Sequence, residues 1–213
     1  MAKSKSSKTS PRKEVILSKA AQLFREKGYN ATSMRDLAEH VGVEAASLYN
    51  HINSKSELLQ EICFRIANQF MEHIEEVASS NASALKKVEA ILRFHIRQMI
   101  DRYEDVYVSD REWKHLSDPY LMNFQSQRRT YRQLFASIIL EGIRAGEIKP
   151  IDAPTAVLIM LHAVSGIESW HRSKQKISGE LLEENMVMIL IDGLGKIERG
   201  SPVKGVAKNE LPT

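Results

Sequence analysis

The sequence predicts an all-α fold of about nine helices. Apolar residues recur with helical spacing along most of the 213 residues, and this periodicity is the main sequence signal of amphipathic helices. The chain has only ten glycines, and none of its six prolines lies between Pro11 and Pro119. An antiparallel sheet needs turn residues roughly every 8–12 positions. Because such turn residues are missing, the pattern excludes an all-β protein.

The first two expected helices have clear start and stop signals. Ser10 followed by Pro11 begins a helix over 10–28. Ser33 and Asp36 have the spacing of a capping box, in which each side chain bonds the backbone N–H of the other residue, and they begin a helix over 33–42.

The remaining helices are expected from apolar stripes and caps. These helices cover residues 45–52, 55–78, 85–99, 119–142, 153–173 and 179–196. Residues 103–113 show no clear periodicity and are expected to form an irregular aromatic stretch.

Composition and charge narrow the class of protein. The longest apolar runs have six residues, whereas a membrane-spanning helix needs about 20, so we expect a cytoplasmic protein with no membrane partner and no signal peptide. The single cysteine, Cys63, excludes an internal disulfide and a cysteine-built zinc site, and its place on an apolar stripe predicts a small core residue.

The positive charge is concentrated near the N-terminus. Residues 1–56 carry ten Lys or Arg and five acids, a net charge of +5, and the rest of the chain has a net charge of −2. A basic arm on a slightly acidic body indicates a nucleic-acid surface, with a solvated flexible tail as the alternative. We expect a disordered basic arm over 1–9 and a disordered tail over 199–213.

Residues 33–52 have the pattern of a helix-turn-helix. Gly42 lies in the turn, where glycine adopts a left-handed conformation without steric cost. Leu48 and Ile52 face inward in the second, short helix, and its outer face is small or polar. Small residues allow close approach to a DNA groove, and polar ones reach base edges and phosphates. The alternative is an ordinary helical hairpin in a bundle.

The stretch over 16–59 resembles the DNA-binding domain of TetR-family transcriptional regulators. The matching positions are Ala20, Ala21, Leu23, Phe24, Gly28, Tyr29, Thr32, Leu37, Ala38, Val41, Gly42, Val43, Leu48, Tyr49, His51, Lys55, Leu58 and Leu59. The resemblance implies a helix-turn-helix domain over 10–54 and a ligand-binding and dimerisation domain over 55–198. It also implies a homodimer on a near-palindromic double-stranded operator, since one short helix contacts only a few base pairs.

The resemblance also implies roles for individual residues. Phosphate contacts would come from Thr32, Ser33, Tyr49, His51 and Lys55, and Ala45, Ala46, Ser47 and Asn50 would face the bases. Two positions depart from the family pattern, with Ile52 in place of Phe and Glu44 in place of Ser. A carboxylate at position 44 favours the N-terminus of a helix and is expected to cap it, although it could instead accept a hydrogen bond from a cytosine amino group.

The C-terminal helices suggest a dimer interface and an effector site. The helices over 153–173 and 179–196 are expected to form an intermolecular four-helix bundle, unless they only complete the monomer core. An effector of the acyl-CoA class is expected because apolar and aromatic side chains accompany basic ones. The expected ligand-binding residues are Arg97, Trp113, Phe124, Arg128, Tyr131, Phe135, Met160, Ile167 and Trp170, and Arg129, Arg132 and Arg172 add to the basic set or form a solvated face.

Part of the C-terminal region adds weak support for that effector class. Residues 170–172, 176–178 and 193–194 are similar to TetR regulators that sense CoA thioesters, although His171 replaces an expected tyrosine. We therefore expect a repressor that a small hydrophobic effector releases from its operator. The alternative is an efflux-type regulator of uncharged or cationic compounds, with Glu112 and Glu168 as candidate acids.

The chain is not expected to be an enzyme or to need a cofactor. None of the seven histidines has HExxH spacing, and we expect no metal site. His95 and His162 lie on apolar stripes, where a hydrogen-bonded histidine is the default. An all-α enzyme or ligand carrier would show paired carboxylates or a Glu-x-x-His pair on facing helices, and no such set is found.

Overall fold

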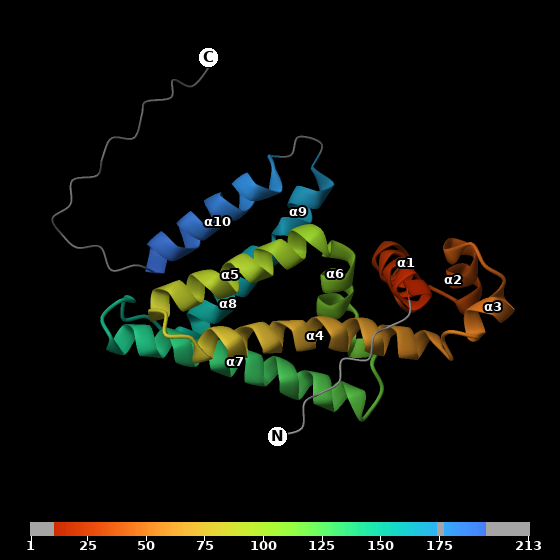
Figure 1. Cartoon of the computed structure of the whole chain (residues 1–213), viewed down its shortest axis with the longest axis horizontal. Coiled ribbons are helices and arrows are strands. Elements are labelled where there is room, and N and C mark those ends of the chain that lie inside the picture. Colours follow the sequence, from red (N-terminus) through yellow and green to blue (C-terminus); the bar gives the residue numbers. More distant parts are fainter. Residues whose placement is uncertain (1–10, 174–176, 195–213) are drawn as a thin grey trace, which may run out of the picture.

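The computed structural model describes residues 11–173 and 177–194. The expected arm over 1–9, the cap Ser10 and the expected tail over 199–213 lie outside the described residues. Within the described ranges the chain folds into ten α-helices and one short 3-10 helix, η1, which confirms the all-α fold (Figure 1). The helices are α1 (Pro11–Lys27), α2 (Met34–Val41), α3 (Ala45–Tyr49), α4 (Lys55–Ser79), α5 (Ala84–Asp101), α6 (Tyr103–Arg111), η1 (Trp113–His115), α7 (Tyr120–Arg144), α8 (Ala153–Ser165), α9 (Ile167–Arg172) and α10 (Gly179–Leu194).

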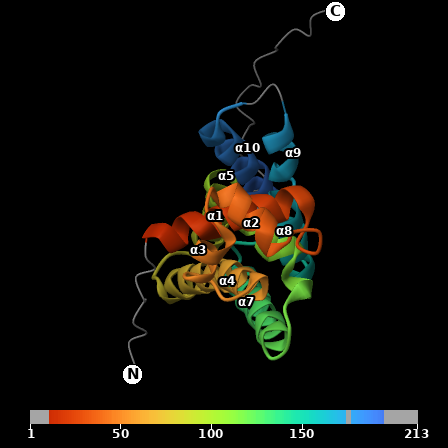
Figure 2. The same ribbon diagram turned by 90° about the vertical axis from the view of Figure 1, so that its right-hand side faces the viewer.

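Helices α1, α2 and α3 form a small unit at one end of the molecule. Figure 2 looks onto this end and shows α1, α2 and α3 in front of the other helices. Their apolar side chains meet in one buried cluster, which also contains the N-terminal half of α4 and three residues from α6, the 115–119 loop and α7. Buried side chains of this cluster include Phe24, Leu37, Leu48, Ile52, Leu59 and Cys63. Burial raises the pKa of the Cys63 thiol to about 12, as expected for a small core residue.

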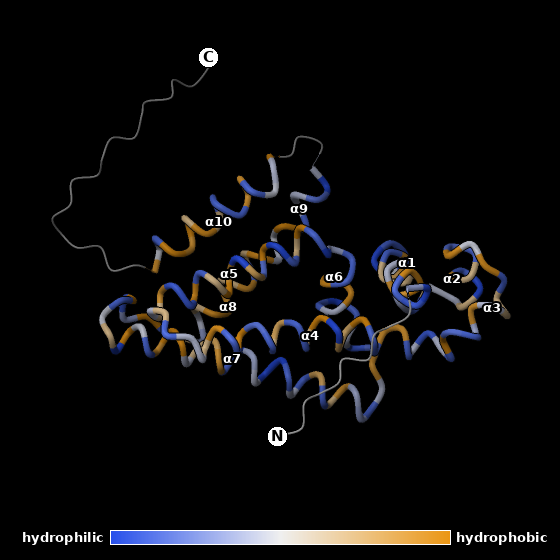
Figure 3. Tube along the Cα trace, viewed as in Figure 1, coloured by the Kyte–Doolittle hydropathy of each residue, from blue (hydrophilic) through white to orange (hydrophobic). Residues whose placement is uncertain are grey.

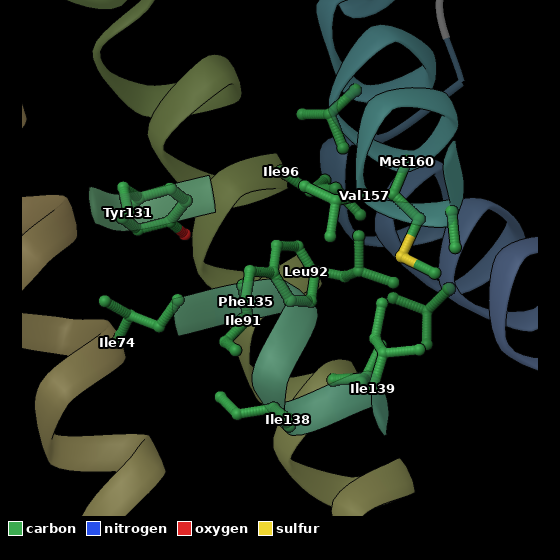
Figure 4. Packing of buried hydrophobic residues seen from close by; sticks show 14 of the residues in the cluster. Ile74, Ile91, Leu92, Ile96, Tyr131, Phe135, Ile138, Ile139, Val157 and Met160 are labelled. Carbon is green, nitrogen blue, oxygen red and sulfur yellow. The ribbon is translucent and has the colours of Figure 1, made fainter. Parts of the chain in front are cut away.

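The larger part of the molecule, the C-terminal bundle, consists of α4 to α10. Figure 3 shows hydrophobic positions along the faces on which these helices meet. Figure 4 shows the centre of this second cluster, where Phe135 of α7 packs among side chains of α5 and α8. The buried residues there include Ile91, Leu92, Ile96, Ile139, Val157 and Met160. None of the helices in the described part of the chain combines the length and apolar character that a membrane span requires.

The segment expected to be irregular, 103–113, contains the regular helix α6. Its buried face includes Asp105, whose carboxylate forms ion pairs with Arg65 of α4 and with Arg102. A buried acid interrupts the apolar stripe, so the periodicity of the sequence does not reveal this helix.

The expected single helix over 153–173 is divided at Gly166 into α8 and α9. The Gly166 N–H donates to the carbonyl oxygens of both His162 and Ala163, at 3.2 and 3.1 Å, which tightens the last turn of α8. A Cβ atom on Gly166 would lie only 3.0 Å from the Ala163 carbonyl oxygen. The absence of a side chain therefore allows the tight turn.

Candidate nucleic-acid interface and internal cavity

The turn between α2 and α3 has the geometry that the sequence predicts. The backbone N–H of Asp36 donates to Ser33 Oγ at 3.1 Å, and the backbone N–H of Ser33 donates to Asp36 Oδ2 at 2.8 Å, which completes the capping box. Gly42 has φ 80°, and its N–H bonds the carbonyl oxygen of Ala38 at 3.0 Å. The backbone here is left-handed, a conformation that glycine adopts without strain.

One side of helix α3 packs against the N-terminal cluster, and the other side is exposed to solvent. Leu48 and the following Ile52 are buried in the N-terminal cluster. On the opposite side, Ala45, Ala46 and Asn50 are exposed, and the Tyr49 side chain is 51% exposed. This helix therefore presents small and polar side chains outward at the end of the molecule.

Other expected DNA-contacting residues surround this exposed face. Ser33 is exposed, and Ser47 and His51 are half-buried. Glu44 occupies the N-cap position of α3 but makes no side-chain capping hydrogen bond, so the capping bond expected from the sequence is not formed. Its exposed carboxylate still lies next to the first turn of α3.

Thr32 and Lys55 have a role that the sequence did not predict. Thr32 is 1% exposed, and its hydroxyl donates to the Gly28 carbonyl oxygen at 2.9 Å. Lys55 Nζ donates to the carbonyl oxygens of Tyr29 and Thr32, at 2.8 and 2.7 Å, and lies 4.3 Å from the centre of the Tyr29 ring. Both side chains therefore brace the loop between α1 and α2, and a buried Thr32 hydroxyl is not available to a phosphate.

A cavity of about 370 Å³ lies inside the C-terminal bundle, bordered by α4 to α9. Its apolar wall comes mainly from α4 and α8 and includes Ile66, Phe70, Met71, Leu161 and Val164, and Met99 of α5 and Val106 of α6 add to it. Polar and charged side chains from α6, α7 and α9 also line it, namely Asp110, Arg111, Gln127, Arg128, Arg132 and Glu168. The cavity thus combines an apolar wall with a charged edge, and its volume falls in the range of about 300–1,000 Å³ typical of small-molecule sites.

Three of the nine expected ligand-binding residues line this cavity: Phe124, Arg128 and Tyr131. Trp113 does not line the cavity itself but contacts the lining residue Arg128, whose guanidinium carbon is 5.6 Å from the centre of the Trp113 ring. The other five do not line the cavity. Phe135, Met160 and Ile167 are buried in the core, Trp170 Nε1 donates to the Ile177 carbonyl oxygen at 3.0 Å, and Arg97 donates to Glu183 of α10 from two nitrogens, each at 2.8 Å.

This difference has a simple physical cause. All residues of an apolar stripe face inward, but only those at the level of the void contribute to its wall, and the level of the void depends on how the helices cross. In the case of Arg97, the hydrogen bonds to Glu183 lower the pKa of that carboxyl and join α5 to α10.

The charged edge of the cavity is internally paired. Arg128 Nη2 lies 2.9 Å from Asp110 Oδ1, and Arg111 Nη2 lies 3.3 Å from Glu168 Oε2. Arg172 also contacts Glu168. The third arginine of the lining, Arg132, is exposed. Three arginines and two acids therefore leave the lining with a net positive charge. Glu112, one of the acids expected for a cationic ligand, does not line this cavity.

Most lining residues lie outside the expected set, and His95 and Arg111 are two of them. His95 was expected to be a hydrogen-bonded core histidine, and its Nε2 indeed lies 2.6 Å from the Tyr131 hydroxyl, but it also lines the cavity. Arg111 carried no signal, because α6 itself was not expected. Across residues 11–173 and 177–194, no group of three or more His, Cys, Asp or Glu is placed to hold a metal ion.

Helices α8 and α10 both carry exposed apolar side chains, which together are called the apolar band. Ile189 is 69% exposed, and Leu158, Ile159, Leu181 and Met188 are between 49% and 59% exposed. Leu158 and Ile159 lie on α8, and the other three lie on α10. An exposed apolar band of this extent marks an interaction surface more often than a solvated one.

Comparisons with known proteins agree with this geometry. Residues 16–62 match the family described as "Bacterial regulatory proteins, tetR family", and residues 81–194 match "Tetracyclin repressor-like, C-terminal domain". The chain is 23% identical over 196 residues to the HTH-type transcriptional repressor KstR2 of Mycolicibacterium smegmatis, covering 91% of this chain and 96% of that protein.

Two solved structures have the same fold. The ketosteroid transcriptional regulator KstR2 of Mycobacterium tuberculosis superposes with a TM-score of 0.81 at 21% identity, covering 88% of this chain and 97% of that one. AibR, in a complex with isovaleryl coenzyme A and operator DNA, superposes with a TM-score of 0.72 at 24% identity, covering 84% and 98%. The two family matches span the exposed helix α3 and most of the C-terminal bundle. The chain therefore belongs to the TetR family, and it is a DNA-binding transcriptional repressor and not an enzyme.

Proposed function

We propose that this repressor binds a near-palindromic operator as a homodimer and leaves it when an acyl-CoA thioester enters the cavity. The observation that carries the effector class is the combination of an apolar wall with three arginines at the edge of one cavity. An uncharged compound would not require the arginines, whereas the phosphates of CoA form strong charge-assisted hydrogen bonds with guanidinium groups.

Helix α3 is the element proposed to enter the major groove. Ala45, Ala46, Ser47 and Asn50 would face the bases, and Ser33, Tyr49 and His51 would contact phosphates. Exposure of these side chains supports the assignment, except for Ser47 and His51, which are half-buried. Glu44 would approach a cytosine amino group only if the phosphates near it are neutralised by other groups.

The dimer is proposed to form through α8 and α10. The exposed apolar band on these helices supports this interface. One reading helix contacts only a few base pairs, so a two-fold dimer on two half-sites supplies the specificity that a single copy lacks.

Helix α4 provides the connection between effector and operator. Its N-terminal residues pack in the same cluster as α1 to α3, and its middle residues Ile66, Phe70 and Met71 line the cavity. An effector shifts the orientation of the DNA-binding unit only if it binds one arrangement of α4 more tightly than the other. The proposed domains, 10–54 and 55–198, would then be mechanically joined through this helix.

Binding of AibR to isovaleryl coenzyme A supports the effector class by analogy, because that structure shares the fold of this chain. The alternative effector, a hydrophobic cation, would use Asp110 and Glu168. Both acids are already paired with arginines, so a cation would have to break an ion pair to reach either of them. Arg111 and Arg128 are held in the same pairs, but Arg132 has no ion pair in the described part of the chain, so a phosphate can approach this arginine without breaking one.

Operator release tests the proposal directly. Fluorescence anisotropy on DNA from upstream of the gene is measured with isovaleryl-CoA, octanoyl-CoA, free octanoate, CoA alone and a cationic dye. We expect release by the thioesters at concentrations at which free octanoate has no effect. Release by the dye alone would show that the effector class is wrong.

The charged edge is tested with a matched pair of variants. Arg128→Ala removes a lining guanidinium, and Arg129→Ala removes a neighbouring exposed one that does not line the cavity. A charge-assisted hydrogen bond contributes about 1.5–3 kcal/mol, so we expect the thioester Kd to rise roughly 10- to 100-fold in Arg128→Ala and little in Arg129→Ala. Equal effects in the two variants would contradict the placement of the phosphates.

A further inference from the structure

A polar pair interrupts the apolar wall of the cavity. His95 Nε2 of α5 and the Tyr131 hydroxyl of α7 share a hydrogen bond of 2.6 Å, and both residues line the cavity. Phe70 of α4 stacks on the His95 ring with 4.2 Å between ring centres and meets the Tyr131 ring edge-on at 6.1 Å. Figure 4 shows Tyr131 and its hydroxyl at the edge of the hydrophobic cluster. The pair is thus held rigidly by an aromatic neighbour.

Both members of the pair are neutral in the folded protein. Burial lowers the pKa of His95 to about 3, and burial raises the pKa of Tyr131 far above its usual range. At neutral pH the pair consequently offers hydrogen-bonding capacity without charge. A carboxylate placed against it would lose its hydration without gaining a counter-ion.

One bond between the two groups does not use their full capacity. If His95 donates from Nε2–H, the Tyr131 hydroxyl hydrogen remains free to donate, and if Tyr131 donates, its oxygen remains free to accept. In the absence of a ligand, water entering the cavity can satisfy this remaining capacity. An alkyl group over the pair displaces that water without replacing its hydrogen bond, which weakens binding.

We infer that the His95–Tyr131 pair recognises one neutral oxygen, a ketone or a hydroxyl, on the apolar body of the effector. The inference deepens the proposed function and rests on use of this cavity as the effector site, but it does not depend on a CoA group. It distinguishes an oxygenated effector from a plain alkyl one, since a site that hydrogen-bonds a ligand oxygen discriminates strongly against the analogue that lacks it.

The test uses three probes with one skeleton and no CoA: dicyclohexyl ketone, dicyclohexylmethanol and dicyclohexylmethane. Affinities are measured by calorimetry or ligand-observed NMR for the full chain and for Tyr131→Phe, which keeps the volume of the side chain and removes only the hydroxyl. Tyr107→Phe is the matched control, because Tyr107 also lines the cavity and is not part of the pair. Thermal melting establishes that each variant is folded.

We expect the ratio of ketone affinity to hydrocarbon affinity to fall about tenfold in Tyr131→Phe, which corresponds to about 1.4 kcal/mol for one hydrogen bond lost to the ligand. The alcohol ratio should fall similarly, and both ratios should stay unchanged in Tyr107→Phe. A purely structural tyrosine would change all three affinities together and leave the ratios as they were.

Three results would overturn the inference: unchanged ratios in Tyr131→Phe, equal changes in both variants, or no binding of any probe to the full chain. These results are separable from failure of the proposed function. If CoA thioesters do not release the operator but the ratios fall only in Tyr131→Phe, the acyl-CoA class is wrong and the oxygen site stands.

Discussion

Replacing Ile189 with Arg should dissociate the proposed dimer and thereby abolish operator binding. Ile189 is the most exposed member of the apolar band on α8 and α10, at 69%. Full burial of a Leu, Ile or Met side chain contributes about 1.5–3 kcal/mol. Five half-exposed side chains in each of two copies therefore supply a gross gain of about 10 kcal/mol. This gain is comparable with the association cost of about 4–15 kcal/mol, so the loss of a single apolar contact is expected to weaken the dimer measurably.

The arginine acts in two ways. It removes about 2–4 kcal/mol of apolar burial over the two copies, and it places two guanidinium groups in the interface without partners. We expect the dimer Kd to rise at least about 100-fold, measured by sedimentation velocity over a range of protein concentrations. Gel-shift titrations should show a matching loss of operator affinity.

Met122→Arg is the matched control for this experiment. Met122 is 65% exposed but lies near the start of α7, outside the apolar band. The control should sediment as the parent protein does. An Ile189→Arg variant that remains a dimer at the same concentrations would refute the interface and leave α8 and α10 as parts of the monomer core.

Four further predictions concern the helix caps, the packing and the coupling of sites. Hydrogen bonding to Ser33 lowers the pKa of Asp36 from 3.8 to about 2, so its stabilising effect is present above about pH 4 and is lost as the pH falls toward 2; urea unfolding of Asp36→Asn should lack this pH dependence. Gly142→Ala would place a Cβ 2.5 Å from Ile148 Cδ1, and we expect a loss of about 1–3 kcal/mol in the free energy of unfolding, with a lower Tm. Lys55→Ala removes two hydrogen bonds to carbonyl oxygens of the α1–α2 loop and should lower the stability by about 1–3 kcal/mol besides weakening operator binding, whereas unchanged melting would contradict the bracing role. Paired titrations should show effector and operator changing each other's affinity by the same factor, and independent binding would exclude the proposed coupling.

The sequence alone determined most of the secondary structure, including the helix-turn-helix. Caps, stops and apolar spacing act within a few residues of the chain, so Ser33, Asp36 and Gly42 specify α2 and its turn wherever the rest of the molecule lies. The short polar helix that follows was recognisable for the same reason. A dense, local pattern over 16–59 was enough to predict the family.

Tertiary structure decided the composition of the cavity and the roles of several charged residues. Asp105 is buried against Arg65 of α4, a partner 40 residues away in the chain, as well as against its neighbour Arg102, and this acid concealed α6 from the periodicity. Arg97 was expected to meet a ligand, but it bonds Glu183 across α5 and α10.

Tertiary structure also decided which apolar residues line the cavity and which lie in the core. A stripe position states that a side chain faces inward, but not whether it meets another side chain or a void. Which of the two it meets depends on how helices far apart in sequence cross. Tyr131 therefore lies on the cavity wall, whereas Phe135, one turn further along α7, lies within the core. Contacts such as Arg97 with Glu183 form between residues distant in the sequence, so the local spacing of apolar and charged residues does not reveal them.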